Sequence, residues 1–149
     1  YMLNNRSSKS MGDSKPEYRM FRNRPIFKGG ATNRGSSFTM LHRKGGFPEN
    51  RALRVLPGPE NIEYKLYFSP DIAMANELCM TKDATPEEFK FFEWASVWSP
   101  KQLEQEYDKK MWLTIKAPSD VIFDDNQAPF PLWSRIVASL PHDLLRPKK

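Results

Sequence analysis

The most regular pattern of apolar and polar residues lies between Ile62 and Phe68, where every second side chain is apolar. A period of two is typical of a β-strand with one buried face. A shorter strand is expected at Leu53–Leu56, where an apolar run meets a Pro-Gly-Pro turn. The pattern therefore predicts two strands near the middle of the chain.

Three later segments begin with a hydroxyl residue followed by proline, at 69–70, 85–86 and 99–100. A Ser or Thr side chain accepts a hydrogen bond from a free N–H of the first helical turn, and proline is well tolerated at the first helical position. Glu88 and Gln102 stand three residues after the second and third hydroxyl residues, as in a capping box. The expected helices are 70–80, 86–97 and 100–111.

The second of these helices, 86–97, is apolar around most of its circumference. Such a helix needs cover on more than one side. We therefore predict that one side packs on the core of this chain and another contacts a partner protein. The third helix is more ordinary, with Leu103, Tyr107 and Met111 four residues apart on one face. The residues expected at the protein interface are Phe91, Phe92, Trp94 and Trp98.

The pattern is weaker beyond residue 111. Two apolar runs, 112–115 and 121–123, favour short strands on either side of an Ala-Pro-Ser link. The sequence Asp124-Asp125-Asn126 is typical of a solvated turn, and its neighbours lack the glycine and distal glutamate of a calcium loop. Leu132–Leu140 is expected to form a last short helix.

These elements predict an α+β fold with three divisions. Residues 53–140 are expected to form a small irregular domain with short strands and three or four short helices. Residues 1–52 are expected to form a long extended basic arm, since six of the seven glycines lie there and no periodicity persists. Residues 141–149 are expected to be a short basic tail.

Charge separates the two halves of the chain. Residues 1–54 hold twelve Lys and Arg against three acids, whereas residues 55–149 carry an excess of four acids. Eight of the twelve bases are arginine, which binds phosphate through two hydrogen bonds and stacks on bases. Aromatic residues lie between these charges, an arrangement that suits unpaired bases of RNA. The predicted RNA-binding residues are Arg19, Arg22, Arg24, Lys28, Arg34, Arg43, Lys44, Tyr18, Phe21, Phe27 and Phe38.

Candidate catalytic chemistry is sparse. The only cysteine, Cys79, excludes an internal disulfide and a zinc site of paired cysteines. His42 and His142 are the only histidines. A triad of Ser139, His142 and Asp143 would be crowded into five residues, without the strained turn that exposes a nucleophilic serine. No apolar run reaches the ~18–20 residues of a membrane span. We therefore expect no catalytic residue, no metal and no cofactor.

The organisation resembles that of organellar ribosomal proteins, which pair a small globular part with a long basic arm. The resemblance depends on the run from Arg19 to Arg54, about a third of the chain. It implies a non-catalytic structural subunit of the mitochondrial ribosome, located in the matrix, whose arm contacts rRNA and whose other partners are neighbouring proteins.

An alternative is an accessory subunit of a mitochondrial inner-membrane respiratory complex or ATP synthase. Such subunits are also often small, processed from a presequence and rich in proline and aromatic residues, and under this alternative the protein is expected on the matrix side of the inner membrane, close to its surface. The first residue, Tyr1, is compatible with a removed presequence under either hypothesis.

Overall fold

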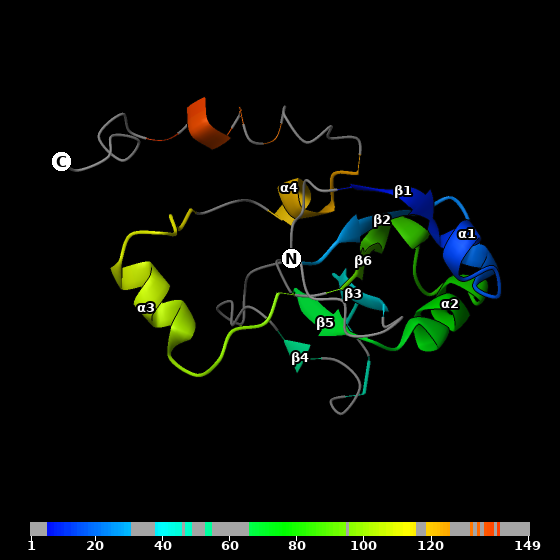
Figure 1. Cartoon of the computed structure of the whole chain (residues 1–149). Coiled ribbons are helices and arrows are strands. Elements are labelled where there is room, and N and C mark those ends of the chain that lie inside the picture. Colours follow the sequence, from blue (N-terminus) through cyan, green and yellow to red (C-terminus); the bar gives the residue numbers. More distant parts are fainter. Residues whose placement is uncertain are drawn as a thin grey trace.

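The computed structural model is organised around a mixed β-sheet, which contains six strands within the described part of the chain (Figure 1). The strand order is β1-β2-β6-β3-β5-β4. The strands are β1 (Arg6–Ser10), β2 (Pro25–Lys28), β3 (Phe38–His42), β4 (Leu53–Arg54), β5 (Tyr67–Ser69) and β6 (Phe89–Glu93). The structure describes residues 6–30, 38–45, 47–48, 53–54, 66–94, 96–115, 119–125, 132, 134, 136–138 and 140.

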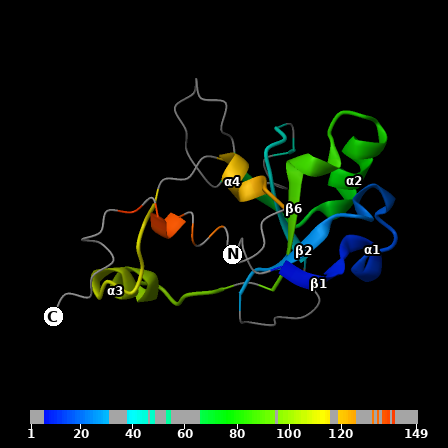
Figure 2. The ribbon, with the colours of Figure 1, turned by 90° about the horizontal axis from the view of Figure 1, so that it is seen from above.

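Short helices lie on both faces of this sheet. The helical elements are α1 (Met11–Ser14), η1 (Arg19–Phe21), α2 (Ile72–Met80), η2 (Pro86–Glu88), α3 (Gln102–Asp108) and α4 (Ser119–Phe123). In Figure 2, α1 and α2 lie on one side of β2 and β6, and α4 lies on the other. Both views show α3 standing apart from the sheet, beyond the end of β6.

Strand β6 occupies the centre of the sheet. It pairs with β2 in parallel, so that Ile26 lies opposite Phe91, and with β3 in antiparallel orientation, so that Met40 also lies opposite Phe91. Successive side chains of a strand point to opposite faces, so Phe91 and Phe92 enter different cores. A strand covered on both faces is apolar throughout rather than alternating, which accounts for its run of phenylalanines.

The helix predicted over 86–97 is therefore wrong. The capping-box contact is present, because the Thr85 N–H donates to Glu88 Oε2 at 2.8 Å, but it begins only the short 3₁₀ turn η2. The chain then becomes extended as β6. A short apolar run has no periodicity that separates a buried strand from a buried helix. The aromatic content of this run favours the strand.

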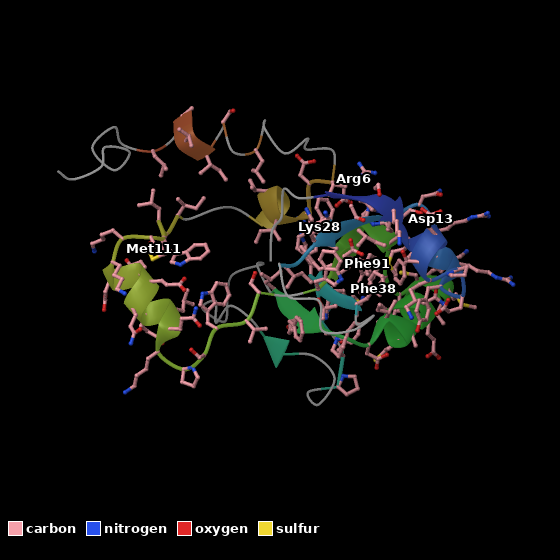
Figure 3. The ribbon with its side chains drawn as sticks, in the orientation of Figure 1. Arg6, Asp13, Lys28, Phe38, Phe91 and Met111 are labelled. Carbon is pink, nitrogen blue, oxygen red and sulfur yellow. The ribbon has the colours of Figure 1, made fainter. Side chains whose placement is uncertain are left out.

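Two hydrophobic clusters fill the space between the sheet and its helices. On the face covered by α1, η1 and α2, the cluster contains Met11, Phe21, Ile26, Met40, Ile72, Ala75, Cys79, Ala84, Phe89 and Phe91. On the face covered by α4, it contains Phe27, Leu41, Leu66, Phe92 and Phe123. Figure 3 shows Phe91 among the packed side chains of the sheet and Met111 outside them, on the separate α3 segment.

The predicted extended arm is also wrong for the described residues of 1–52. They form β1, β2 and β3, and they contribute Met11, Phe21 and Ile26 to the core. The sequence pattern missed them because each apolar run is only a few residues long. Strands β2 and β3 pair with β6, which lies far along the chain, so no local sequence window contains both members of a pair. Residues 1–52 and the domain predicted over 53–140 therefore share one sheet.

Close backbone packing at Gly12 shows how this segment becomes compact. The Gly12 N–H donates to the Arg22 carbonyl oxygen at 3.0 Å. A Cβ atom at position 12 would lie 2.7 Å from that oxygen, a distance too short for any side chain. Glycine therefore allows α1 to lie against the chain that leaves η1, and the glycine content that indicated an arm serves packing here.

Several predicted elements are present in the structure. The α+β class is confirmed, as are helices within 70–80 and 100–111. Of the predicted 53–56 strand, Leu53–Arg54 form β4. Of the predicted 62–68 strand, Tyr67 and Phe68 belong to β5, and Leu66 lies before it.

The C-terminal part of the chain differs more from the predicted elements. The predicted strand at 121–123 is helix α4, and 112–115 has no regular secondary structure. Within the helix predicted over 132–140, the described residues 132, 134 and 136–138 are helical and Leu140 is not, and the tail at 141–149 lies outside the described residues. Within the described part of the chain, no helix has the length and apolar character needed to cross a membrane.

Candidate functional site

Helix α3 begins with half of the predicted capping box: the Gln102 side chain accepts from Ser99, but the Ser99 hydroxyl accepts no bond from the first helical turn. The Ser99 N–H donates to Gln102 Oε1 at 3.0 Å, and the Gln102 N–H donates to the Ser99 carbonyl at 3.0 Å. Lys101, between them, adopts the left-handed conformation with φ of 66°. The chain thus turns sharply out of the segment after β6 and enters the helix.

The other end of α3 forms a Schellman motif. The Met111 N–H donates to the Glu106 carbonyl at 3.0 Å, and the Lys110 N–H donates to the Tyr107 carbonyl at 2.9 Å. Lys110 has φ of 60°, in the left-handed region that glycine usually occupies at this position. This turn directs residues 112–115 away from the helix axis, so that they can lie beside α3.

A hydrogen-bonded clasp joins the segments on either side of the helix. Glu106 Oε2 accepts from Trp98 Nε1 at 3.0 Å and from Trp112 Nε1 at 2.7 Å. Glu106 Oε1 accepts from Gln102 Nε2 at 2.9 Å. Hydrogen bonds from Trp112, Trp98 and Gln102, in that order, lower the pKa of Glu106. The two indole rings pack edge to face, 5.8 Å between centroids. The carboxylate therefore fixes both tryptophans.

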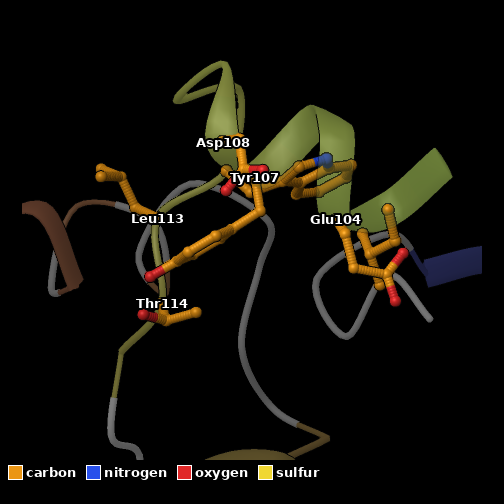
Figure 4. Close-up of a pocket in the computed structure, with 7 residues that line it drawn as sticks. Glu104, Tyr107, Asp108, Leu113 and Thr114 are labelled. Carbon is orange, nitrogen blue, oxygen red and sulfur yellow. The ribbon is translucent and has the colours of Figure 1, made fainter. Parts of the chain in front are cut away.

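The clasp forms one end of a groove of about 480 Å³ between α3 and the chain that follows it. Figure 4 shows Tyr107 reaching from the helix toward Leu113 and Thr114. The large apolar lining side chains are 44–50% exposed, far more than the core side chains of the sheet. The groove is lined by Leu103, Glu104, Tyr107, Asp108, Trp112, Leu113 and Thr114.

The charged groups of the lining are both acidic. Glu104 and Asp108 lie four residues apart, one helical turn, and therefore on the same side of α3. Both side chains are exposed. The groove thus combines exposed apolar side chains with two exposed carboxylates.

The sequence pattern contained this site without identifying it. The stripe of Leu103, Tyr107 and Met111 was expected on an ordinary amphipathic helix, yet Met111 is 65% exposed and the other two line the groove. A usable signal was the pair of tryptophans at 98 and 112 with Glu106 between them. Tryptophan is enriched at interfaces, and its N–H usually donates a hydrogen bond when the ring is buried.

The residues predicted to bind RNA do not form one surface. Phe21 and Phe27 are buried in the two clusters, and Tyr18 and Phe38 pack against the first of them, so these rings are not free to stack on bases. Arg19 and Arg22 are exposed at η1. Arg34 lies outside the described residues. The remaining bases, Arg24, Lys28, Arg43 and Lys44, are spread over both ends of the sheet.

Several of these bases interact with groups of this chain. The Lys28 ammonium lies 5.8 Å from the centroid of the Trp94 ring, and the Arg43 guanidinium lies 4.4 Å from that of Phe123. The Lys44 carbonyl accepts a hydrogen bond from His42 Nδ1 at 2.9 Å.

The predicted protein interface is corrected in the same way. Phe91 and Phe92 are fully buried on opposite faces of β6, so they stabilise this chain instead of contacting a partner. Trp94 is half-buried just after the strand, with φ of 64°. Only Trp98 belongs to the groove region, through its bond to Glu106.

A buried ionic cluster lies under α4, where the sequence predicted a solvated turn. Asp125 forms ion pairs with Arg24 and with Lys90, whose ammonium is 3.9 Å away. That ammonium also lies 3.9 Å from the centroid of the Phe27 ring. Burial lowers the pKa of Lys90 to about 8 and raises the pKa of Asp125. The cluster attaches the end of α4 to the sheet.

Two of the residues considered for catalysis, His42 and Cys79, lie in the core, and His142 lies outside the described residues. His42 is fully buried between aromatic rings, with the Phe47 centroid 4.3 Å away, and burial lowers its pKa to about 4. Its Nδ1 faces a carbonyl oxygen and is therefore a donor, which leaves Nε2 as a buried acceptor without a hydrogen-bond partner. Burial raises the pKa of Cys79 to about 11. Among the described residues, no group of His, Cys, Asp and Glu could hold a metal ion.

Comparison with known proteins gives a consistent set of relatives. A family model described as DUF179, AlgH-like, matches residues 1–145. A UPF0301 protein of Pelodictyon phaeoclathratiforme is 32% identical over 99 residues, and one of Chlorobium phaeobacteroides is 34% identical over 99 residues. Each match covers 66% of this chain and 48% of the relative. A UPF0301 protein of Rickettsia typhi is 29% identical over 106 residues, which cover 68% of this chain and 48% of the relative.

The chain thus spans about half the length of the curated relatives it matches. The solution structure of the AlgH protein from Pseudomonas aeruginosa matches with a TM-score of 0.64 at 18% identity. That match covers 99% of this chain and 75% of the other. At this identity the match establishes a shared fold.

These findings contradict the ribosomal hypothesis and its respiratory-complex alternative. The matching proteins are AlgH-like and come from bacteria, so the predicted mitochondrial location is also wrong. The hypothesis depended on the charge and glycine content of the first 54 residues. Those features accompany strands and helices of the sheet domain, and hence give no evidence for a ribosomal arm.

Proposed function

We propose that this chain, which belongs to the AlgH-like family, is a non-catalytic protein-binding module whose binding surface is the groove beside α3. The observation that carries the proposal is a preformed apolar groove on a segment that stands apart from the core. The clasp at Glu106 holds the walls of the groove, so little conformational entropy would be lost when a partner binds.

Burial energetics favour a partner at this position. A large apolar side chain contributes about 1.5–3 kcal/mol when it is fully removed from water. Leu103, Tyr107 and Leu113 each retain nearly half of their exposure, so covering them would contribute roughly 1 kcal/mol apiece. A partner that covers the groove therefore gains several times the thermal energy from these three side chains.

The extent of the apolar surface favours a protein partner over a small molecule. Val97, Met111 and Ile115 are 51%, 65% and 41% exposed, and they lie in the same segment outside the groove lining. Small-molecule sites usually enclose most of their ligand. A large amount of exposed apolar surface on one segment is instead typical of protein interaction sites.

The placement of reactive groups supports a non-catalytic role. His42 and Cys79 are buried away from the groove, whose polar groups are two carboxylates and the hydroxyls of Tyr107 and Thr114. Among the described residues, no hydrogen bond joins a carboxylate of this lining to either hydroxyl, which is the pairing by which a general base activates a nucleophile.

Site-specific photo-crosslinking tests the proposal. A photo-reactive amino acid replaces Leu113 in the groove or, as a matched control, Lys82, which is exposed in the turn after α2. In cells that make the protein, we expect discrete protein adducts from position 113 and none from position 82. Tyr107→Glu in the same chain should abolish the adducts. Identical adducts from both positions, or none from either, would contradict the proposed function.

A further inference from the structure

We infer that the segment bound in the groove presents a large apolar anchor flanked by Lys or Arg side chains, which pair with Glu104 and Asp108. The inference rests on the proposed function and specifies the chemistry of its partner. It follows from the charges that line the groove and from the carboxylates that remain available there.

The three acidic residues of α3 differ in what they already bind. Glu106 accepts hydrogen bonds from two indoles and one amide, so its carboxylate is occupied within the chain. Glu104 and Asp108 form no ion pair or hydrogen bond through their side chains with any described residue. Both of these free carboxylates belong to the groove lining, and the occupied one does not.

Nearby lysines are directed to other groups. The Lys110 ammonium lies 5.7 Å from the centroid of the Tyr107 ring, and the charge of Lys109 helps to lower the pKa of Glu106. Neither lysine lines the groove. The groove lining within the described part of the chain therefore carries two negative charges and no positive charge.

Complementary charge would act mainly on selectivity. Exposed ion pairs contribute little affinity individually, but like charges at an interface are repelled, and opposite charges accelerate association. Two such pairs around an apolar anchor should favour a basic segment over an acidic one by about fivefold to tenfold at low salt. The apolar floor should supply affinity to either.

Three dye-labelled helical peptides test this chemistry against the full chain by fluorescence anisotropy. One has leucine anchors flanked by lysines, the second has glutamates in place of the lysines, and the third keeps the lysines but has serine anchors. We expect the first to bind at least about fivefold more tightly than the second, and the third to bind weakly. The preference should shrink as salt rises from 50 to about 500 mM, because screening shortens the range of exposed charges.

Charge reversal supplies the decisive comparison. The Glu104→Lys/Asp108→Lys variant should reverse the preference in favour of the acidic peptide. The matched control, Glu77→Lys/Glu87→Lys, makes the same change in net charge at exposed positions of α2 and η2. It should keep the wild-type preference. Circular dichroism of both variants should match that of the wild type.

Other outcomes distinguish a failure of the charge inference from a failure of the proposed function. If both leucine peptides bind equally and Leu113→Glu abolishes their binding, the charge inference is overturned while the groove remains a protein-binding site. If binding of every peptide is insensitive to Leu113→Glu, the proposed function itself fails. A concentration-dependent dimer in sedimentation experiments that Leu113→Glu dissociates would assign the groove to a second copy. Occupation by residues 141–149, detected as peptide binding that appears only after their removal, would also overturn the inference.

Discussion

Individual polar residues in the core of this protein have pKa values that differ from their values in water. Lys90 is almost fully buried, and its charge is balanced by Asp125 and by the face of the Phe27 ring. A buried charge that loses its partner costs about 3–5 kcal/mol, so these groups depend on one another. The neutral imidazole of His42 avoids such a cost, because burial favours its uncharged form.

His42 should make the stability of the protein depend on pH. The pKa of His42 is about 4 in the folded chain and near 6.5 when unfolded, so between these values only the unfolded chain takes up the proton. The contribution of His42 is therefore complete above pH 6.5 and is lost as pH falls toward 4. We expect the free energy of unfolding, measured with urea, to lose about 3 kcal/mol more over this window in wild type than in His42→Leu. Equal slopes for the two proteins would refute this.

Elements differ in how far local sequence determines them. Helix α2 and helix α3 were predictable because their boundaries are set by nearby side chains, such as Gln102 at the start of α3. Strand β6 was not, because its extended conformation depends on pairing with β2 and β3, which lie far away in the sequence. Local patterns thus recovered α2 and α3, but they misassigned the central strand β6 and helix α4.

The Schellman turn after α3 offers a test at the scale of one element. Lys110 adopts φ of 60°, which costs a residue with a Cβ atom roughly 1–2 kcal/mol relative to glycine. Lys110→Gly should therefore stabilise the α3 segment by about 1 kcal/mol, seen as slower hydrogen exchange of its amides. Lys109→Gly is the matched control, because Lys109 has φ of −74°, and it should have the opposite effect. Faster exchange in Lys110→Gly would contradict this expectation, because it would show that the left-handed conformation of Lys110 does not limit the stability of the α3 segment.

At the scale of the whole molecule, the chain consists of a sheet covered on both faces and an α3 segment that stands apart from it. The α+β class followed from sequence because both kinds of element leave local signals. The groove did not, because it requires Tyr107, Trp112 and Leu113 to converge through a turn at Lys110 that no motif indicates. The excess of basic residues in 1–54 was misleading for a related reason. It describes the composition of the segment and does not indicate where those side chains lie in the folded chain.

The separation of these two regions should be measurable. Glu106→Ala removes the acceptor for both indoles, so the segment from Trp98 to Trp112 should loosen while the sheet remains intact. We expect amide exchange in α3 to accelerate at least tenfold and exchange in β6 to change by less than about twofold. Glu104→Ala, which removes a carboxylate without these bonds, should leave both rates unchanged. Equal acceleration in α3 and β6 would mean that the two regions unfold together.

The central position of β6 also affects how the protein is made. The strands β2 and β3 are synthesised early, but both flank a position that only β6 fills, about 60 residues after β2 and about 50 residues after β3. At about 5–20 residues per second, β2 waits roughly 3–12 s and β3 roughly 2–9 s with an unpaired edge and uncovered phenylalanines. A nascent chain in that state is a substrate for chaperones that recognise exposed apolar strands. Synthesis that slows between β3 and β6 should therefore lower the yield of soluble protein more than slowing after β6.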